Sequence, residues 1–372
     1  MNHGVQPWEA DPSAFLFKSA LRGGLGMLRL SSEAMRGALA GREAAADLRE
    51  LGNKLEVFER FQYALAAIGA SGEAPLPLPE AVRRTAALEP WTRLWVVEGV
   101  GHACAEAAWR APGPLQGLLA SLAAQRIPAE AWIPLHTGMG LSFAANVLGE
   151  HARNGSPDPT PDGLRAALRL LLGLCADNSS PGYARAAFEG LGFVACNLHS
   201  HLVPEIDRQL APELRSYFWH GVGRGLYFSP AGFLPGWTAT AMARAASEPP
   251  DEEGRRNAIA GAAWALALVN LRHPEVLGSL LTRQPWLCRS PADRALVDGV
   301  SSAVAIWCDA AGANAWLTAF LRYRPGNGQA AQHWQRLIEE PCRRAIRSCA
   351  GLRRSRRLED LFRYRPLGGP PR

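Results

Sequence analysis

The sequence predicts an all-α protein, an irregular helical-repeat bundle built from about six glycine-rich helices and their partner helices. Three observations support this fold class. Stretches that alternate apolar and polar residues and are rich in β-branched side chains are scarce, which argues against a sheet. Helix-start signals recur along the chain, and glycine-rich apolar segments return at roughly the length of one helical hairpin.

The helix-start signals are hydroxyl or carboxylate residues followed directly by proline. They occur at Asp11, Thr160, Ser180 and Ser290. The side-chain oxygen suits the N-cap, and proline suits the first helical position because its missing N–H would have no partner there. We therefore expect a helix to begin at each of these sites, with the proline-rich and glycine-rich segments between them as loops.

The repeat consists of apolar segments with one lead glycine each. They read VVEGVGHACA, PLHTGMGLSFA, AFEGLGFVAC, FWHGVGRGLYF, AIAGAAWALAL and LVDGVSSAVAI. Their lead glycines are Gly99, Gly138, Gly190, Gly221, Gly261 and Gly299. Successive spacings of 39, 52, 31, 40 and 38 residues are too uneven for an ordered array, so we interpret the pattern as a decayed repeat.

Ionisable residues occupy a common position in five of these six segments. Glu98, His136, Glu189, His220 and Asp298 each follow a proline by seven or eight residues. The helix dipole does not explain this placement, because its effect fades within the first turn. If the glycine-rich helices surround a common axis, these side chains would converge at similar depth in an apolar cavity.

Two further ionisable residues share a helix face with members of this layer. His102 follows Glu98 by four residues, and Arg224 follows His220 by four. The candidate catalytic residues are therefore Glu98, His102, Glu189, His220, Arg224 and Asp298.

Carboxylates and imidazoles in an apolar site have two chemical uses and one ordinary explanation. They can bind a metal such as non-haem iron, or they can transfer protons with pKa values shifted by burial and by each other. Either use calls for a hydrophobic substrate. The ordinary explanation is that each residue lies at the solvent edge or is hydrogen-bonded to a neighbour. The sequence leaves the cofactor and any metal unknown.

The glycines also have two explanations. Small residues four apart, such as Gly221 and Gly225, let neighbouring helices approach closely, which can offset a cost of about 1 kcal/mol for glycine inside a helix. Alternatively, they form the walls of a pocket for a flat, unsaturated ligand. The candidate substrate-binding residues are Gly99, Gly138, Gly190, Gly221, Gly225 and Trp219. A dinucleotide fingerprint is excluded because no strand precedes the glycines.

The positive charge is concentrated near the C-terminal end. Between Arg336 and Arg365, ten arginines accompany four acidic residues, so this stretch alone carries the whole formal net charge of +6. The simpler interpretation of this stretch is a solvated helix. The functional interpretation is an arm that docks on an acidic protein or makes peripheral contact with an anionic membrane. Nucleic acid is not expected as a partner, because the body has no excess positive charge and no reader motif.

These features divide the chain into three expected parts. They are an N-terminal helical segment (1–75), a helical-repeat body (76–335) and an Arg-rich C-terminal tail (336–372). A chain of 372 residues that is 48% hydrophobic can bury a large core. The seven cysteines form no CxxC pair, no secretory signal is apparent, and no uncharged stretch reaches the roughly 20 residues of a membrane helix. We expect a cytoplasmic protein.

The order of motifs resembles a bacterial family of unknown function that is associated with enediyne biosynthesis gene clusters. The likeness covers most of the chain, from about Phe15 to the helix after Ser290, and includes the early segment FLFKSALRGGLGML. Its most specific element is F-x-x-G-x-G-R-x-L-x-F, matched by Phe218, Gly221, Gly223, Arg224, Leu226 and Phe228. The stretch GFVACNLHSHLVPEID and the Arg-rich tail depart from the family pattern.

The resemblance implies an accessory role beside an iterative polyketide synthase, on or around a hydrophobic polyene intermediate. An acidic acyl carrier protein would then suit the arginine-rich tail. Two classes of function follow. One is an enzyme, such as an oxidoreductase, isomerase or cyclase, that uses the ionisable layer. The other is a non-catalytic scaffold or hydrophobic-ligand-binding protein of the biosynthetic complex.

Overall fold

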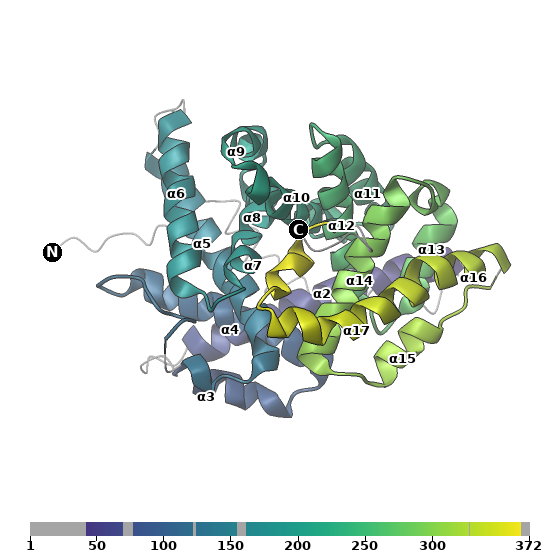
Figure 1. The fold of residues 1–372 in the computed structure, drawn as a ribbon, viewed down its shortest axis with the longest axis horizontal. Helices are drawn as coiled ribbons and strands as arrows, with labels where there is room; N and C mark the ends of the chain where they lie inside the picture. The colour runs from purple at the N-terminus through teal and green to yellow at the C-terminus, as the bar shows by residue number, and fades with distance from the viewer. Residues whose placement is uncertain (1–41, 70–76, 122–123, 155–160, 327, 366–372) are drawn as a thin grey trace.

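The computed structural model describes residues 42–69, 77–121, 124–154, 161–326 and 328–365, which contain α-helices, short 3-10 and π turns and no strand (Figure 1). The α-helices are α2 (Arg42–Gly69), α3 (Leu78–Arg84), α4 (Pro90–Arg110), α5 (Trp132–Asn154), α6 (Pro161–Asn178), α7 (Ala184–Phe188), α8 (Gly190–Leu198), α9 (Val203–Gln209), α10 (Pro212–Tyr227), α11 (Trp237–Ser247), α12 (Glu252–Val269), α13 (Pro274–Arg283), α14 (Ala292–Ala311), α15 (Ala315–Arg322), α16 (Gly328–Trp334) and α17 (Glu340–Arg354). The predicted all-α bundle is confirmed.

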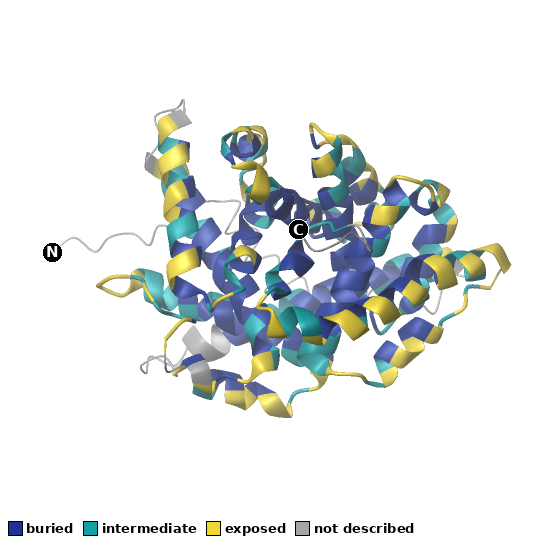
Figure 2. Cartoon of the chain, in the orientation of Figure 1, coloured by how far each residue is buried: buried dark blue, intermediate teal, exposed yellow. Residues whose placement is uncertain are grey.

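The glycine-rich helices pack on one another in chain order and close into a circuit. Helix α4 contacts α5, α5 contacts α7 and α8, α8 contacts α10, α10 contacts α12, α12 contacts α14, and α14 returns to α4. These helices form the dark blue, buried interior of the molecule (Figure 2). The bundle therefore has the common axis on which the predicted convergence of side chains depends.

One type of helix crossing recurs around this circuit. At four crossings, the lead glycine of one helix lies against the carbonyl oxygen of the residue just before the lead glycine of its neighbour. The pairs are Gly138 with Glu98, Gly221 with Glu189, Gly261 with His220, and Gly299 with Ala260. A methyl group on Gly261 would lie 1.9 Å from the His220 oxygen, so only glycine permits this approach. The decayed sequence repeat therefore corresponds to a repeated backbone contact.

Two of the predicted helix starts require correction. Helix α7 begins at Ala184 rather than after Ser180, whose N–H donates to Nε2 of His136 and whose hydroxyl donates to the carbonyl of Leu119. Those bonds fix a loop, so Ser180 is not an N-cap. Helix α14 begins at Ala292, one residue later than expected, and Pro291 rather than Ser290 stands at its N-cap position.

The other two predicted helix starts involve residues that the structure does not describe. Helix α6 begins at Pro161, as expected, but its proposed cap Thr160 is not described. The start proposed at Asp11, like the rest of residues 1–41, also lies outside the described residues.

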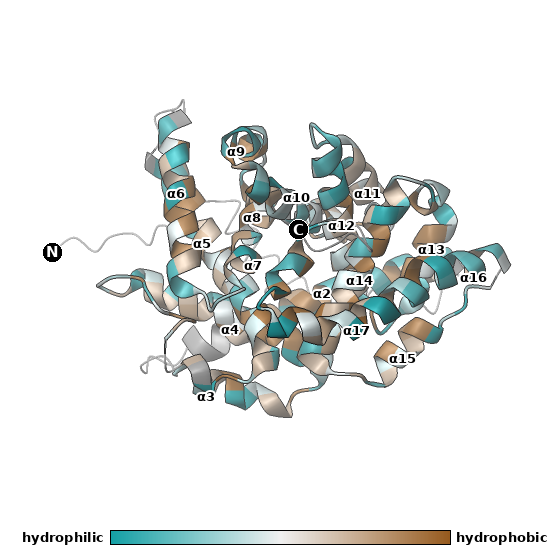
Figure 3. Ribbon diagram, viewed as in Figure 1, coloured by the Kyte–Doolittle hydropathy of each residue, from teal (hydrophilic) through white to brown (hydrophobic). Residues whose placement is uncertain are grey.

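The Arg-rich stretch is folded against the body over its described length. Helix α17 packs on α14 and places Cys342 and Cys349 in the main hydrophobic core, to which α2 contributes Val57 and Ala64. Hydrophilic teal colour recurs along α16 and α17 (Figure 3). Beyond α17, residues 358–365, here called the C-terminal strap, begin with the 3-10 turn η8 (Leu358–Phe362) and contact α7, α10 and α14. The strap is yellow near the centre of Figure 1.

None of the helices within the described ranges is both long enough and apolar enough to cross a lipid bilayer.

Candidate functional site

Four of the six candidate catalytic residues meet inside the circuit of helices. Nδ1 of His220 lies 3.0 Å from Oε1 of Glu189. The guanidinium of Arg224 reaches two carboxylates, with Nη1 at 3.4 Å from Oε1 of Glu98 and Nη2 at 3.4 Å from Oε2 of Glu189. Glu98, Glu189, His220 and Arg224 are here called the central cluster. They join α4, the α7–α8 junction and α10, although α4 and α10 are not neighbours in the circuit.

The central cluster is shielded from solvent. Its side chains belong to residues that are 7% (Glu98), 0% (Glu189), 1% (His220) and 2% (Arg224) exposed. None of them therefore lies at the solvent edge.

Aromatic rings surround the charged groups. The Arg224 guanidinium lies 4.7 Å from the ring centre of Phe193 and 5.7 Å from that of Trp264. The His220 ring meets Trp264 and Phe362 edge to face, each at 6.0 Å between ring centres. Cationic and aromatic groups attract each other in this arrangement, which offsets part of the cost of burying Arg224.

The repeated helix crossing explains why these side chains meet. Glu98, Glu189 and His220 all directly precede a lead glycine, so their backbone carbonyls lie at crossings and their side chains start from equivalent points. Arg224 follows His220 by one helical turn and shares its face of α10. Glu189 lies at a break between α7 and α8, where the chain leaves regular α-helix for a single residue.

The central cluster carries one more negative charge than positive charge. Two ionised carboxylates and one guanidinium leave a net charge of −1 while His220 is neutral, and burial makes such a charge costly. Burial raises the pKa of Glu98, an effect that Arg224 opposes and Glu189 reinforces. One additional proton, on Glu98 or on His220, makes the cluster neutral. The cluster is therefore suited to accept and release a single proton.

His220 has one nitrogen engaged and one available. Glu189 is ion-paired with Arg224, so its ionised carboxylate accepts a hydrogen bond and Nδ1 of His220 is the donor. Nε2 is then the basic nitrogen, and it has no hydrogen-bond partner among the described residues. A buried imidazole that is oriented by a carboxylate and has a free basic nitrogen is the arrangement of a general base.

The remaining candidate catalytic residues lie elsewhere. Asp298 precedes a lead glycine like the others, but Oδ2 of its carboxylate accepts the backbone N–H of Arg365 in the strap at 3.0 Å. Burial raises the pKa of Asp298 to about 7. His102 contacts the ring of Phe61 on α2, with 5.4 Å between ring centres.

His136, which was expected in the same layer, is held by a different set of partners. Its Nδ1 bonds the carbonyl of Trp132 at 2.6 Å, its Nε2 accepts the N–H of Ser180, and its ring stacks on Tyr183. Lead glycines follow a proline by nine residues at Gly99, Gly190 and Gly221 but by ten at Gly138. Thr137 rather than His136 therefore occupies the equivalent position, and its hydroxyl donates to the carbonyl of Pro134 at 3.0 Å.

His136 is expected to stay uncharged across the neutral range. Burial lowers its pKa to about 4, and because the unfolded chain has a pKa near 6.5, stability is lost as pH falls from about 6.5 toward 4. In ¹⁵N-detected NMR titrations, the His136 ring should show no protonation step between about pH 5.5 and 7.5, one unit on either side of the usual histidine value of about 6.5. Titration of His136 near pH 6.5 would contradict this account.

The candidate substrate-binding glycines contact backbone. At Gly99, Gly138, Gly190 and Gly221, an added Cβ would lie within 3 Å of atoms of a neighbouring helix, and at Gly225 it would meet Cys196. This arrangement fits the close-packing explanation. Trp219 is buried and donates from Nε1 to Oδ1 of Asp207 at 2.8 Å. This bond directs the indole N–H of Trp219 to Asp207 and not to the central cluster.

The candidate site residues inferred from the sequence did not include the aromatic wall. Trp264 follows the lead glycine of the fifth segment by three residues, a spacing that marks it as one turn from the crossing. Phe193 follows Gly190 in the same way. Phe362 carried no such signal, because nothing local in the sequence shows that the strap folds back over His220.

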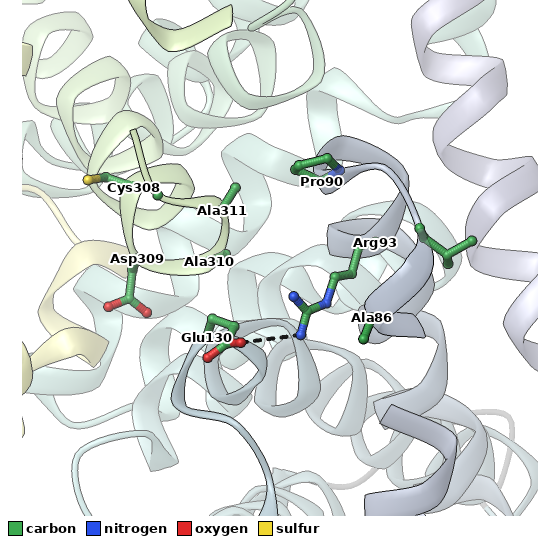
Figure 4. A pocket seen from close by; sticks show the side chains of 10 residues that line it. Ala86, Pro90, Arg93, Glu130, Cys308, Asp309, Ala310 and Ala311 are labelled. Atoms are coloured by element: carbon green, nitrogen blue, oxygen red, sulfur yellow. Dashed lines mark hydrogen bonds and ion pairs between the residues drawn. The ribbon is translucent and has the colours of Figure 1, made fainter. Parts of the chain in front are cut away.

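In the described parts of the chain, no three His, Cys, Asp or Glu side chains are placed to hold one metal ion. A hollow of about 400 Å³ lies between the start of α4 and the end of α14, where Arg93 pairs with Glu130 at 3.4 Å (Figure 4). Asp309 on its other side is paired with Arg353. None of the candidate catalytic residues lines this hollow.

No protein-family model, no curated protein and no solved structure matches this chain.

Proposed function

We propose that the chain is an enzyme that transfers protons on a hydrophobic, unsaturated small molecule, with the central cluster as its reactive centre. The observation that carries this proposal is His220, whose Nδ1 is held by Glu189 while its Nε2 is buried without a hydrogen-bond partner among the described residues. A structural histidine is usually satisfied at both nitrogens, as His136 is in this protein.

The chemistry that fits this geometry is isomerisation of a conjugated chain. Nε2 of His220 takes a proton from a carbon next to the conjugated system, and the electron pair of the broken C–H bond moves into that system. The imidazolium, whose N–H exchanges with solvent, then delivers a proton to a carbon farther along, so a double bond changes place without net oxidation. Glu189 stabilises the imidazolium that forms, and Arg224 lies where it can stabilise negative charge on the substrate.

The substrate class follows from the walls and the resemblance. Trp264 and Phe193 present flat apolar surfaces next to the charged groups, which suits an unsaturated carbon chain. The likeness to an enediyne-associated family makes a polyene made by a polyketide synthase our proposed substrate. The protein would then be an accessory enzyme of natural-product biosynthesis.

The test is solvent deuterium exchange into a synthetic conjugated trienone in D₂O, read by mass spectrometry. The wild type should label the carbon next to the conjugated system, and His220→Gln should slow labelling by about 10²- to 10⁴-fold, the usual contribution of a general base. His201→Gln, in the exposed loop before α9, is the matched control and should label at the wild-type rate. Equal rates for wild type and His220→Gln, both folded by circular dichroism, would overturn the proposal.

A second candidate function is that of a non-catalytic partner in a biosynthetic complex. Arg344, Arg347 and Arg354 are exposed on one side of α17, and none of them has an ion-pair partner among the described residues. That face would suit an acidic acyl carrier protein or an anionic membrane surface. Under this alternative, substitution of the three arginines by serine should abolish co-purification with the synthase, while His220→Gln should leave it unchanged.

A further inference from the structure

The C-terminal strap lies over the central cluster and places one side chain inside it. Phe362 is fully buried, and its ring contacts both His220 and Trp264, with ring centres 6.0 Å and 5.7 Å away. Trp264 is one of the rings that we assign to the substrate-facing wall. A phenyl group from the chain itself therefore occupies the space beside the His220 ring and this wall.

Side chains rather than regular backbone structure hold the second half of the strap. The N–H of Tyr364 donates to Oδ1 of Asn257 on α12 at 2.7 Å, and the N–H of Arg365 donates to Oδ2 of Asp298 on α14 at 3.0 Å. The first half is held more firmly: the Tyr217 hydroxyl of α10 donates to Asp360 at 3.3 Å, Glu359 donates its N–H to the carbonyl of Gly182 at 3.2 Å, and Leu358 and Leu361 are buried in the main core. The second half, whose N–H groups are held by two side-chain acceptors, can open without unfolding the helices beneath it.

We propose that the strap is a displaceable plug, with Phe362 occupying the binding subsite for a flat, unsaturated group of the ligand. The ligand binds when the strap opens, and its planar group then replaces the phenyl ring between His220 and Trp264. This inference rests on the site of the proposed function but not on its chemistry. It identifies a binding subsite about as wide as a phenyl ring. Access to that subsite depends on movement of the strap and not on movement of the helices.

Opening of the strap is coupled to a proton on Asp298. In the closed state, burial raises the pKa of Asp298 to about 7, whereas in water an aspartate has a pKa of about 4. Between about pH 4 and pH 7, opening of the strap therefore releases a proton from Asp298. As pH rises through this window, the equilibrium constant for closing falls by at most roughly tenfold per pH unit. Above the folded pKa both states are ionised and the dependence ends.

Other charged groups near Asp298 also belong to this balance. Arg363 and Arg365 of the strap both favour the ionised form of Asp298. Tyr364 lies near the charges of Arg256 on α12 and of Asp293 and Arg294 on α14. His220 faces Phe362 from α10. A substitution of Asp298 isolates the contribution of that carboxylate, because it leaves these other groups unchanged.

The binding test uses the neutral fluorescent polyene 1,6-diphenylhexatriene as probe. Phe362→Ala vacates the subsite, so this full-length variant should bind the probe at least about tenfold more tightly than the wild type, the free energy of one to two buried methylene-sized contacts. The probe should also protect His220 from modification by diethyl pyrocarbonate, read by mass spectrometry. Phe320→Ala is the matched control, because Phe320 is fully buried but packs on Trp334 instead.

The outcomes are distinguishable from those of the deuterium-exchange test. If Phe320→Ala binds the probe as tightly as Phe362→Ala, or if the probe leaves His220 reactive, the plug is refuted whatever the trienone result. If binding is as expected but His220→Gln still labels the trienone at the wild-type rate, only the proposed chemistry fails.

The opening test measures hydrogen exchange of the Tyr364 and Arg365 amides relative to their unfolded rates. In the wild type, protection should fall by up to roughly tenfold per unit between about pH 5 and 7. In Asp298→Asn it should be independent of pH, because the asparagine oxygen still accepts the Arg365 N–H but does not ionise. A slope that persists in Asp298→Asn would overturn the role of Asp298.

Discussion

Replacing Arg224 by leucine is expected to lower the free energy of unfolding by about 3–5 kcal/mol, the usual cost of removing one partner from a buried ion pair. The substitution leaves Glu98 and Glu189 buried, next to each other and without a counter-charge. Denaturation by urea at neutral pH, followed by circular dichroism, measures the loss.

A compensating substitution and an exposed pair serve as controls for Arg224. Adding Glu189→Gln to Arg224→Leu removes one of the uncompensated charges and should restore part of the lost stability. Arg165→Leu breaks the exposed pair with Asp162 on α6 and should cost less than about 1 kcal/mol. A loss for Arg224→Leu as small as that for Arg165→Leu would mean that water reaches the central cluster.

Replacing Gly261 by alanine is the second large expected effect, a destabilisation of about 1–3 kcal/mol. The new methyl group would lie 1.9 Å from the carbonyl oxygen of His220, and a backbone atom has no rotamer with which to move aside. Because His220 belongs to the central cluster, the same substitution should also disturb its hydrogen bond to Glu189. Thermal unfolding and the ¹⁵N shifts of the His220 ring report the two effects.

The matched control is a glycine inside a helix with open space around it. Gly173 on α6 has no neighbouring atom within 4 Å of an added Cβ. Gly173→Ala should therefore raise stability by about 0.5–1 kcal/mol, since alanine favours the helix and loses less entropy on folding. If Gly261→Ala were stabilising in the same way, the close crossings would not be needed for the fold.

The fold was predictable because its signals are local. Proline at helix starts, the scarcity of strand patterns and the recurring glycines were sufficient to predict an all-α bundle with a repeated unit. The caps proposed at Ser180 and Ser290 were wrong: Ser180 bonds distant loop and helix atoms, and Pro291 stands at the N-cap position of α14. The bonds of Ser180 depend on tertiary context, which local preferences do not contain.

Only those residues of the candidate site that share one position in the repeat were predictable from the sequence. Glu98, Glu189 and His220 share the position before a lead glycine, so a common pattern pointed to them. Counting from proline instead of from glycine misplaced His136 by one residue, which is about 100° around a helix. The contribution of Phe362 depends on how the strap folds over α10, a contact between residues 142 positions apart that no short pattern encodes.

The helix crossings also determine how the molecule responds to force. Where a glycine α carbon rests on a carbonyl oxygen, no side chain lies between the helices to compress or to change rotamer. A displacement of one helix axis must therefore be passed to the next around the circuit instead of being absorbed locally. The framework around Glu189 and His220 should behave as a stiff ring of low compressibility, with its compliance concentrated in the strap, so pressure should shift the strap's opening before it deforms the ring.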